Sequence, residues 1–443
     1  MRILYVSQYF PPEMGAPSAR VHELSREWVR LGHEVTVLTA FAHHPTGRKA
    51  PCDRGVLTRR ETVDGIDVIR TYVYATANKG TLKRMLSYAS FMLSAMTIGR
   101  LRVSRPDVVI ATSPQLLCAM AGYFLARTLR VPFVFEVRDL WPESILAVEA
   151  LKDGAFIRML KGAARYLYKH ADQIVTVGEG YRHGIHTRYG IPLESMEVVR
   201  NGIDTSLFVP GPRDNEVRKE YGWGDRCVIM YVGTHGMAHG LHHVLEAANI
   251  LRDDADKVFV FVGEGAEKEN LKRLAAQWQL PNVQFIDQQS KARIPLFYAA
   301  CDFGLVSLRD TSLFQEVLPS KIFEYLGMAK PILLNVAGEA RQIVEAATAG
   351  VYVPSGNVPA LVEAVRHLAT RGAELDEMGR RGRQFVLEHY DRRVLARRYI
   401  EILNAVIEGQ SAVQASGVAL APRGSSRGAN ATPLAGYQTV AKP

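Results

Sequence analysis

The chain has 443 residues, 47% of them hydrophobic and 22% charged, an ordinary globular balance that predicts two domains, or three, with large buried cores. The formal net charge at pH 7 is +9. The four scattered cysteines include no C-x-x-C pair and no close Cys/His cluster, which argues against a zinc site and a disulfide framework and fits a reducing compartment.

The first part of the chain alternates between strand-like and helix-like segments. It opens on MRILYVSQYF, which alternates like a strand and lacks the long apolar region of a signal peptide. A helical pattern over 18–32 and the strand-like HEVTVLTA follow, so that these segments form a β-α-β unit. Short runs of β-branched and aromatic residues predict further buried parallel strands at 105–113, 131–139 and 171–179.

The alternation restarts after VVRNGIDTSLFVPG. Strands are predicted at 225–234, 256–265, 283–288, 302–308, 331–336 and 350–355, and helices at 240–254 and 266–278. We therefore expect an α/β protein with two Rossmann-like, doubly wound domains, 1–199 and 200–390, that face one another across a ligand-binding cleft. The boundary would fall near Arg200–Pro212.

The last part of the chain has a different composition. From Gly409 onward it contains one aromatic residue and no acidic residue, and Gly, Ala, Ser and Pro dominate. Such a segment cannot bury enough apolar surface to offset its ordering entropy, so residues 409–443 are predicted to be disordered.

The stretch FQEVLPSKIFEYLGMAKPILL, residues 314–334, places Glu316 and Glu324 on either side of Lys321 at the predicted start of a helix. Ser320 is a suitable N-cap there. A helix N-terminus favours an anion, so a lysine in its first turn indicates a bound phosphate, although a solvated surface lysine is the alternative. Glu324 would then accept hydrogen bonds from a ribose diol, and Glu316 would meet a sugar carried on the diphosphate. Either glutamate alone would be interpreted as a surface residue.

A glycine-containing loop supports a phosphate site. In MYVGTHGMAHGLHHV, Gly233, Gly236 and Gly240 lie between a predicted strand and a predicted helix, where backbone amides can approach phosphate oxygens. The loop is neither a Walker motif nor G-x-G-x-x-G. A second turn with Gly263 and Gly265 is weak support by itself.

With these residues in view, the chain resembles the retaining glycosyltransferases of family 4, which have the GT-B fold. The spacing of Glu316 and Glu324, followed by YLGMAKPI, is similar to the nucleotide-sugar signature of that family. The likeness covers residues 1–405 and includes PPEMGAPSARVHELSREWVRLGHEVTVLT, RNGID, VGEGAEKENL and YAACDFGLVSL. EVRDLWPES, GMAHGL and LPSKIFEYL are most similar to a subgroup that builds bacterial surface polysaccharides such as O-antigen and capsule, L-fucosamine-type transferases included.

The resemblance implies roles for individual residues. Glu316 and Lys321 would be the catalytic residues. The donor would be held by Gly15, Gly233, Gly236, His239, Val317, Leu318 and Glu324, and the acceptor side would include Arg138 and Asp139. The family needs neither metal nor cofactor. The final helix, residues 391–408, would cross back onto the first domain. The implied reaction retains the anomeric configuration through a front-face mechanism, in which the leaving phosphate helps to deprotonate the acceptor, and no protein nucleophile is assigned.

The chain departs from the family at two places. Many members carry Arg and Lys in the glycine loop, where this chain has Thr234 and His239. Lys321 could replace one cation and a protonated His239 the other, although an unperturbed histidine is mostly neutral at pH 7. Many members also have His where Arg138 stands. Arg138 could bind an acceptor phosphate, or it could form a structural ion pair with Asp139.

The excess charge lies in residues 1–200, which hold 27 Lys and Arg against 18 Asp and Glu, whereas residues 201–443 balance. Segment 79–105, KGTLKRMLSYASFMLSAMTIGRLRVSR, has an apolar centre between basic flanks, so it is an interfacial helix on an anionic membrane or a core helix with solvated ends. No apolar run reaches the roughly 18–20 residues that span a bilayer.

With the resemblance, this charge distribution predicts three partners: a nucleotide-sugar donor, a polyprenyl-diphosphate-linked glycan acceptor, and the anionic inner face of the cytoplasmic membrane. UDP carrying an N-acetylated amino or deoxyamino sugar is the expected donor, and no nucleic acid is expected.

The sequence gives three other functions far less support than sugar transfer. A UDP-sugar epimerase would use the same two-domain scaffold without an acceptor. A Rossmann oxidoreductase would require a G-x-G-x-x-G motif followed by an acidic residue about 20 positions later, which is absent. A nucleic-acid-binding module would use the basic half, but that half shows no aromatic-basic interleaving and no helix-turn-helix pattern.

Overall fold

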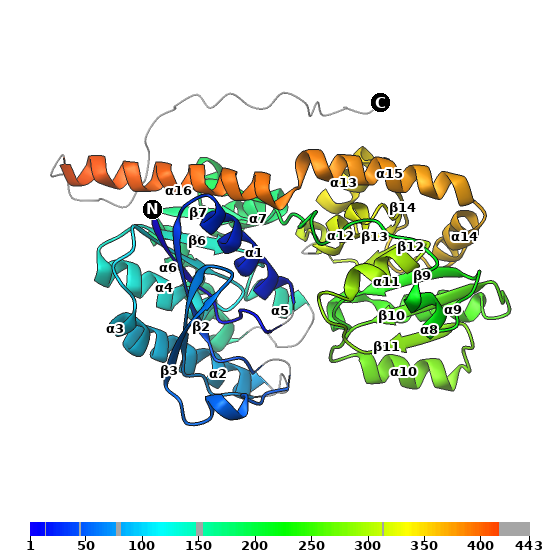
Figure 1. Cartoon of the computed structure of the whole chain (residues 1–443), viewed down its shortest axis with the longest axis horizontal. Coiled ribbons are helices and arrows are strands. Elements are labelled where there is room, and N and C mark those ends of the chain that lie inside the picture. Colours follow the sequence, from blue (N-terminus) through cyan, green and yellow to red (C-terminus); the bar gives the residue numbers. More distant parts are fainter. Residues whose placement is uncertain (14, 44–45, 77–80, 148–153, 312–313, 416–443) are drawn as a thin grey trace.

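The computed structural model describes residues 1–13, 15–43, 46–76, 81–147, 154–311 and 314–415. Two α/β units lie next to one another, each built on one sheet, as Figure 1 shows. The expectation of two Rossmann-like domains is therefore confirmed.

The first sheet has eight strands in the order β3-β4-β2-β1-β5-β6-β7-β8, and only β3 runs antiparallel to its neighbour. The strands are β1 (Arg2–Val6), β2 (Glu34–Ala40), β3 (Thr58–Val63), β4 (Ile66–Thr71), β5 (Val108–Thr112), β6 (Phe133–Val137), β7 (Gln173–Thr176) and β8 (Met196–Val198). In the register, Tyr5 of the central β1 lies beside Val37 and Ile110. The strands predicted from apolar runs are present because a parallel sheet covered on both faces needs such runs.

The predicted strand set lacked β8 and the hairpin of β3 and β4. Asp64 and Gly65, with φ angles of 50° and 79°, connect the two hairpin strands. Positive φ at both central residues favours an Asp-Gly pair in a tight hairpin turn. The adjacent Asp64 and Gly65 were therefore a usable signal for this hairpin.

The helices of the first unit cover both faces of its sheet. They are α1 (Ala16–Arg30), α2 (Thr81–Ser94), the π-helical turn η2 (Ala95–Gly99), α3 (Arg100–Arg102), α4 (Leu116–Leu129), α5 (Glu143–Ala147), α6 (Ala155–His170) and α7 (Glu179–Tyr189), with short 3-10 turns η1 (Pro51–Asp53) and η3 (Leu193–Ser195). Buried side chains of α2, α4 and α6 form one core with one face of the sheet, and those of α1 form another core with the opposite face.

The second sheet has six parallel strands in the order β11-β10-β9-β12-β13-β14. The strands are β9 (Cys227–Val232), β10 (Lys257–Val262), β11 (Val283–Ile286), β12 (Phe303–Ser307), β13 (Ile332–Asn335) and β14 (Gly350–Tyr352). The strand order reverses between β9 and β12, and at such a switch point the loops of a doubly wound sheet leave a crevice for ligand.

Helices cover this sheet too. They are α8 (Glu216–Glu220), the 3-10 turn η4 (Met237–His239), α9 (Leu241–Ile250), α10 (Lys268–Gln277), α11 (Ile294–Ala300), the 3-10 turn η5 (Phe314–Glu316), α12 (Lys321–Gly327), α13 (Glu339–Ala346), α14 (Val358–Ala369) and α15 (Gly372–His389). Buried residues of α11, α12 and α13 belong to one core, and those of α9, α10 and α14 to the other.

The last helix, α16 (Arg392–Ala415), lies along the first unit (Figure 1). The ring of its buried Tyr399 lies 5.2 Å from that of Trp28 in α1, and Trp28 Nε1 donates to the carbonyl of Ala396 at 3.1 Å. The helix continues through residues 409–415, where the sequence predicted disorder. Helix propagation adds a hydrogen bond per residue, and GQSAVQA contains good helix formers and no proline. The remainder of the predicted tail lies outside the described residues.

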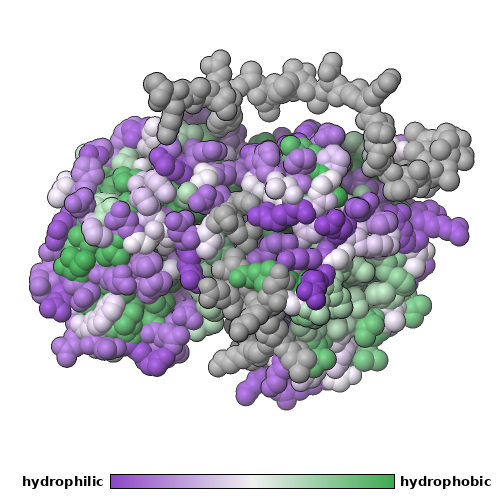
Figure 2. Space-filling model, turned by 180° about the vertical axis from the view of Figure 1, so that it is seen from behind, coloured by the Kyte–Doolittle hydropathy of each residue, from purple (hydrophilic) through white to green (hydrophobic). Residues whose placement is uncertain are grey.

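The surface is mixed in character. Figure 2 shows apolar patches among hydrophilic side chains on the face opposite to that of Figure 1, one of them on the first unit, at the right in this view. Among the described residues, no helix combines the length and the apolar character that crossing a membrane requires.

Candidate active site

The glycine loop after β9 is held in place by the turn after β10. The amide of Gly233 donates to the carbonyl of Val262 at 2.9 Å, and the amide of His235 donates to Glu264 at 2.9 Å. A Cβ on Gly263 would lie 2.0 Å from the carbonyl oxygen of Gly233, and one on Gly265 would lie 2.3 Å from that of His235. The two glycines of the second turn are therefore required for the close approach of the two loops.

Lys321 points at this loop. Its ammonium nitrogen is buried, has no hydrogen-bond partner, and lies 3.2 Å from the position that a Cβ on Gly233 would take. The same nitrogen lies 3.8 Å from the ring centroid of Tyr231. Burial lowers the pKa of Lys321 to about 7, and Glu324 opposes this shift. A desolvated ammonium group without a hydrogen-bonding partner gains most from an anion that enters beside it.

The helix that carries Lys321 is short. α12 has seven residues, and Ser320 occupies the N-cap position without a side-chain hydrogen bond to the helix. The predicted serine cap is therefore wrong, although the predicted helix start is correct. So short a helix contributes little dipole, and the attraction for an anion comes from the lysine and the loop amides.

Glu324 lies one turn further along α12. The hydroxyl of Tyr298 donates to its Oε2 at 2.5 Å. Burial raises the pKa of Glu324, while the Tyr298 hydrogen bond and the charge of Lys321 lower it. The second carboxylate oxygen is left for another donor, so the geometry is compatible with a carboxylate that binds a diol.

His239 does not supply the second cation that the sequence suggested. Burial, together with the charge of Lys321, lowers the pKa of His239 to about 3, so the ring is neutral near pH 7. His239 Cδ2 lies 3.5 Å from the Cβ position of Gly236, and Nδ1 is buried without a partner. His235 is neutral for the same reason, with a pKa lowered to about 4.

The segment before α12 connects the two units. Val317 packs against buried cores of both units, and Leu318 is buried in the second. The amide of Val317 donates to the carbonyl of Phe314 at 3.2 Å. The side chain of Glu316 lies outside the described part of the chain. Its neighbour Gln315 touches Gly338, where a Cβ would lie 2.0 Å from the Gln315 carbonyl oxygen.

Arg138 and Asp139 follow β6 in the first unit, and no ion pair joins them in the part of the chain that the structure describes. The predicted alternative of a structural pair is therefore wrong. Arg138 Nη1 donates to the carbonyl of Pro17 at 3.2 Å, and its Nε is buried without a partner. Burial lowers the pKa of Arg138 and raises that of Asp139 to about 6.

Gly15 is the N-cap of α1, with φ of 129°. It lies two residues before Pro17, whose carbonyl Arg138 contacts, so the predicted Gly15 and Arg138 belong to the same corner of the first unit.

Three charged residues that the sequence did not single out join the units beside this site. Glu23 of α1, with 5% of its side chain exposed, accepts from Lys291 Nζ at 2.6 Å and pairs with Arg392 Nη2 at 2.9 Å. Arg392 also donates to the carbonyl of Gly202, while its Nε and Nη1 are buried without partners. The charges of Glu23 and Arg392 both act on Glu324. No local motif marks these residues, because they meet only after folding.

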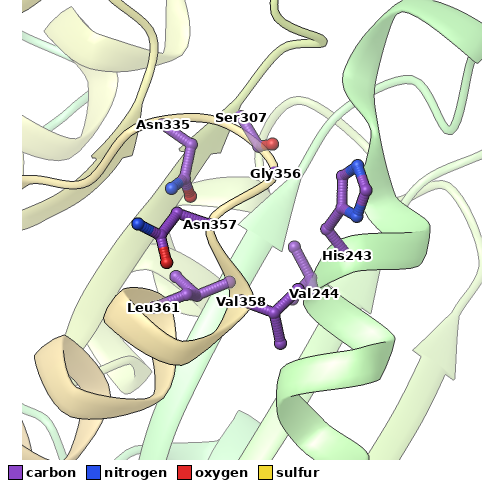
Figure 3. A pocket seen from close by; sticks show the side chains of 8 residues that line it. All are labelled: His243, Val244, Ser307, Asn335, Gly356, Asn357, Val358 and Leu361. Atoms are coloured by element: carbon purple, nitrogen blue, oxygen red, sulfur yellow. The ribbon is translucent and has the colours of Figure 1, made fainter.

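A separate small pocket opens beside the carboxyl ends of β12 and β13 (Figure 3). Side chains from α9 face those from β12, β13 and the start of α14 across it; the residues are His243, Val244, Ser307, Asn335, Gly356, Asn357, Val358 and Leu361. None of the predicted site residues lines it, and it contains no lysine or arginine. Among the described residues, no group of three or more His, Cys, Asp and Glu could hold a metal ion.

Two α/β domains, each built on a largely parallel sheet, with a C-terminal helix that crosses back onto the first domain, have the architecture of the GT-B class of glycosyltransferases. The model of the glycosyl transferase 4-like domain matches residues 15–202, and that of glycosyl transferases group 1 matches residues 213–385. The chain therefore belongs to family 4 of the GT-B glycosyltransferases, and it is a glycosyltransferase.

Individual relatives agree with this assignment. The glycosyl transferase WcaI of Escherichia coli, whose name refers to colanic acid biosynthesis, is 26% identical over 376 residues, which are 83% of this chain and 91% of that protein. The glycosyltransferase WbjE of Pseudomonas aeruginosa is 24% identical over 68% of this chain and 75% of its own. The structure of Anabaena HepE in complex with UDP and glucose superposes with a TM-score of 0.69 at 17% identity, covering 91% of this chain and all (100%) of HepE.

Proposed function

We propose that the chain transfers a sugar from a UDP-linked donor to a lipid-linked glycan during synthesis of a bacterial surface polysaccharide, with retention of the anomeric configuration. The observation that carries the proposal is the buried ammonium group of Lys321, which lies beside the glycine loop and has no hydrogen-bond partner. A leaving diphosphate would occupy that place. The HepE complex with UDP and the colanic acid assignment of WcaI support the donor and the pathway class.

The chemistry requires above all that the leaving diphosphate be stabilised. Lys321 supplies a full charge to it, and amides of the glycine loop other than those of Gly233 and His235, which already donate to the neighbouring turn, supply hydrogen bonds. Glu324, positioned by Tyr298, accepts from the ribose. Glu316 and the backbone around Leu318 hold the sugar. The acceptor hydroxyl attacks the anomeric carbon on the face from which UDP departs. Its proton passes to a phosphate oxygen of the leaving group, so no protein nucleophile is needed.

The donor site can be tested by calorimetric binding of UDP, GDP, ADP and NAD to the wild type and to Glu324→Ala. We expect UDP to bind best and its affinity to fall about tenfold or more in the variant, because a charged hydrogen-bond acceptor is lost. Glu246→Ala, at an exposed position of α9, is the control and should bind UDP like the wild type. Best binding of NAD, or the absence of diphosphate binding, would overturn the proposal.

The acceptor is proposed to be a polyprenyl-diphosphate-linked glycan at the inner face of the cytoplasmic membrane, and the donor sugar an N-acetylated amino or deoxyamino sugar. The likeness of 136–144 to transferases of the L-fucosamine type supports the sugar. Arg138, with its unpartnered Nε on the acceptor side, is suited to an acceptor phosphate. Incubation with UDP-sugar in the absence of acceptor tests the epimerase alternative. We expect no isomerised donor, and the relatives described above, which are transferases, give that alternative no support.

A further inference from the structure

Three consecutive long helices of the first unit contain no acidic residue. They are residues 81–102, which form α2, η2 and α3, together with α4 and α6. Their nine basic residues are Lys83, Arg84, Arg100, Arg102, Arg127, Arg158, Lys161, Arg165 and Lys169. Residues 1–200 carry nine more basic than acidic residues, so these helices hold the entire excess charge of the chain. A solvated basic surface of ordinary composition would have mixed signs.

The same three helices lie side by side on one face of the first sheet. α2 and η2 contact α4, and α4 contacts α6. Buried residues from all three, among them Phe91, Leu125 and Leu160, belong to one core. In Figure 1, α3 and α4 lie at the left of this unit and α2 at its bottom. The opposite face, by contrast, is covered by α1 and α16, which both contain glutamates.

Each helix also exposes large apolar side chains on its outer surface. Their exposed fractions are 50% for Leu86, 58% for Leu93, 85% for Leu101, 37% for Phe124, 41% for Phe156, 61% for Met159 and 43% for Tyr166. Single exposed apolar residues are normal, but here they repeat along three adjacent helices among basic residues. Arg127 of α4 pairs with Asp172, which lies outside these helices, at 3.8 Å. A surface that combines apolar residues with positive charge, on helices that themselves contain no acidic residue, is complementary to the headgroup region of an anionic bilayer.

We propose that the outer faces of α2–α3, α4 and α6 form one continuous docking surface for an anionic lipid bilayer. This surface extends well beyond segment 79–105, because α6 contributes four basic residues and three exposed apolar ones. The inference rests on the proposed function in one respect, since a lipid-linked acceptor requires the enzyme to work at a membrane. A nucleic acid is the competing anionic partner, but base-stacking and phosphate contacts do not call for exposed leucines and a methionine.

The test is co-flotation of the purified full-length chain with vesicles of phosphatidylcholine alone or of phosphatidylcholine and phosphatidylglycerol in equal parts. Three double variants share the same design, in which an exposed apolar residue becomes Ser and a nearby Arg becomes Glu. They are Arg158→Glu/Met159→Ser on α6, Leu101→Ser/Arg102→Glu on α3, and Ile250→Ser/Arg252→Glu at the end of α9 in the second unit, where Ile250 is 53% exposed. Circular dichroism confirms that each variant is folded.

We expect the wild type to bind only the anionic vesicles, and both first-unit variants to bind them about tenfold or more weakly, because each basic residue near a charged surface contributes strongly. The α9 variant should bind like the wild type. Unchanged binding by the α6 variant would remove α6 from the surface. Equal binding to neutral vesicles, or retention by double-stranded DNA without flotation, would overturn the proposal.

Calorimetric titration with UDP separates this inference from the proposed function. All three variants should bind UDP like the wild type, since none of the substituted residues belongs to the donor site. Normal UDP binding without flotation of the wild type would refute the docking surface alone. Flotation without UDP binding would refute the donor assignment and leave the surface intact.

Discussion

Lys321 is the residue whose protonation should govern donor affinity. Its pKa of about 7 is low because the ammonium group is buried without a hydrogen-bond partner, and a bound diphosphate would raise it. Below pH 7 the group is already charged in the free protein. Above pH 7 UDP binding must take up a proton, so its affinity should fall by up to about tenfold per pH unit until the pKa of the complex is reached. Calorimetry between pH 7 and pH 9, in two buffers with different ionisation enthalpies, measures both the affinity and the proton uptake.

Lys321→Met is the control for this pH dependence. The variant should bind UDP weakly, and its affinity should be nearly constant over the same pH range, in which the phosphate of UDP is already ionised. An equal slope in the wild type and the variant would show that another group is responsible. His239 is not a candidate, because its pKa of about 3 leaves it neutral throughout the range.

At the scale of single residues, the sequence identified candidate residues but not their environment. The spacing of Glu316 and Glu324 around Lys321, together with the glycine loop, predicted a phosphate site, and the structure places Lys321 beside that loop. The partners that set the chemistry were not predictable, because Tyr231 under Lys321 and Tyr298 beside Glu324 come from distant segments. The neutrality of His239 follows from burial, which no local pattern reports.

At the scale of the elements, the glycine loop after β9 is held in its conformation by the turn after β10, which packs against it. Gly263 has φ of 141°, and a Cβ there would lie 2.0 Å from the backbone oxygen of Gly233. Gly263→Ala should therefore lower the free energy of unfolding by more than about 2 kcal/mol, through backbone strain and a clash that a rigid loop cannot relieve. Because the displaced loop includes Gly233, affinity for UDP should fall as well. Thermal unfolding and UDP titration measure the two effects.

Gly222→Ala is the matched control for Gly263→Ala. Gly222 also has a positive φ, of 66°, but a Cβ there would meet nothing within 4 Å. The cost should be limited to the left-handed backbone, about 1 kcal/mol, with unchanged UDP affinity. If both variants lose the same stability and keep their affinity, the close contact between the loops has no role in the site.

The parallel strands were the part of the structure that was easiest to predict from the sequence, because buried parallel strands are continuous apolar runs. The β3–β4 hairpin is a different case. Its first strand, TRRETV, is almost entirely polar, and its second strand, IDVIRT, alternates only in part, so that the turn at Asp64 and Gly65 is the clearest local sign of the hairpin. The prediction that Ser320 caps α12 was wrong for a physical reason. Ser320 adopts helical φ and ψ angles, and its side chain makes no hydrogen bond to the helix.

At the scale of the whole molecule, the ionic junction at Glu23 connects α1, the second unit and the start of α16. Glu23→Gln removes the carboxylate from Arg392, whose side chain is only 9% exposed, and should cost about 3 kcal/mol of unfolding free energy. Lys291→Met should cost about 1 kcal/mol or less, because the Lys291 side chain is 43% exposed. Denaturant unfolding of both variants and of Glu23→Gln/Arg392→Met tests this, and the double variant should recover part of the loss. Equal costs for the Glu23 and Lys291 variants would contradict the burial argument.

The crossing of α16 makes the first unit depend on the last part of the chain. Tyr399 is fully buried against Trp28, and Leu403 belongs to the same core. Tyr399→Ala should therefore destabilise the first unit by about 3–5 kcal/mol, since an aromatic side chain is removed from a packed core. Val394→Ala, on the same helix but 49% exposed, should change stability by less than about 0.5 kcal/mol.

UDP binding, measured together with thermal unfolding, shows whether the effect of Tyr399→Ala is confined to the first unit. Lys321, Glu324 and the glycine loop, the groups proposed to bind the donor, belong to the second unit. Tyr399→Ala should therefore lower the temperature of unfolding while UDP affinity at 25 °C stays close to that of the wild type. Loss of UDP binding at temperatures where the variant is still folded would mean that α16 also positions the donor site. The buried Arg392, at the first position of that helix and within electrostatic reach of Glu324, is the route by which it would do so.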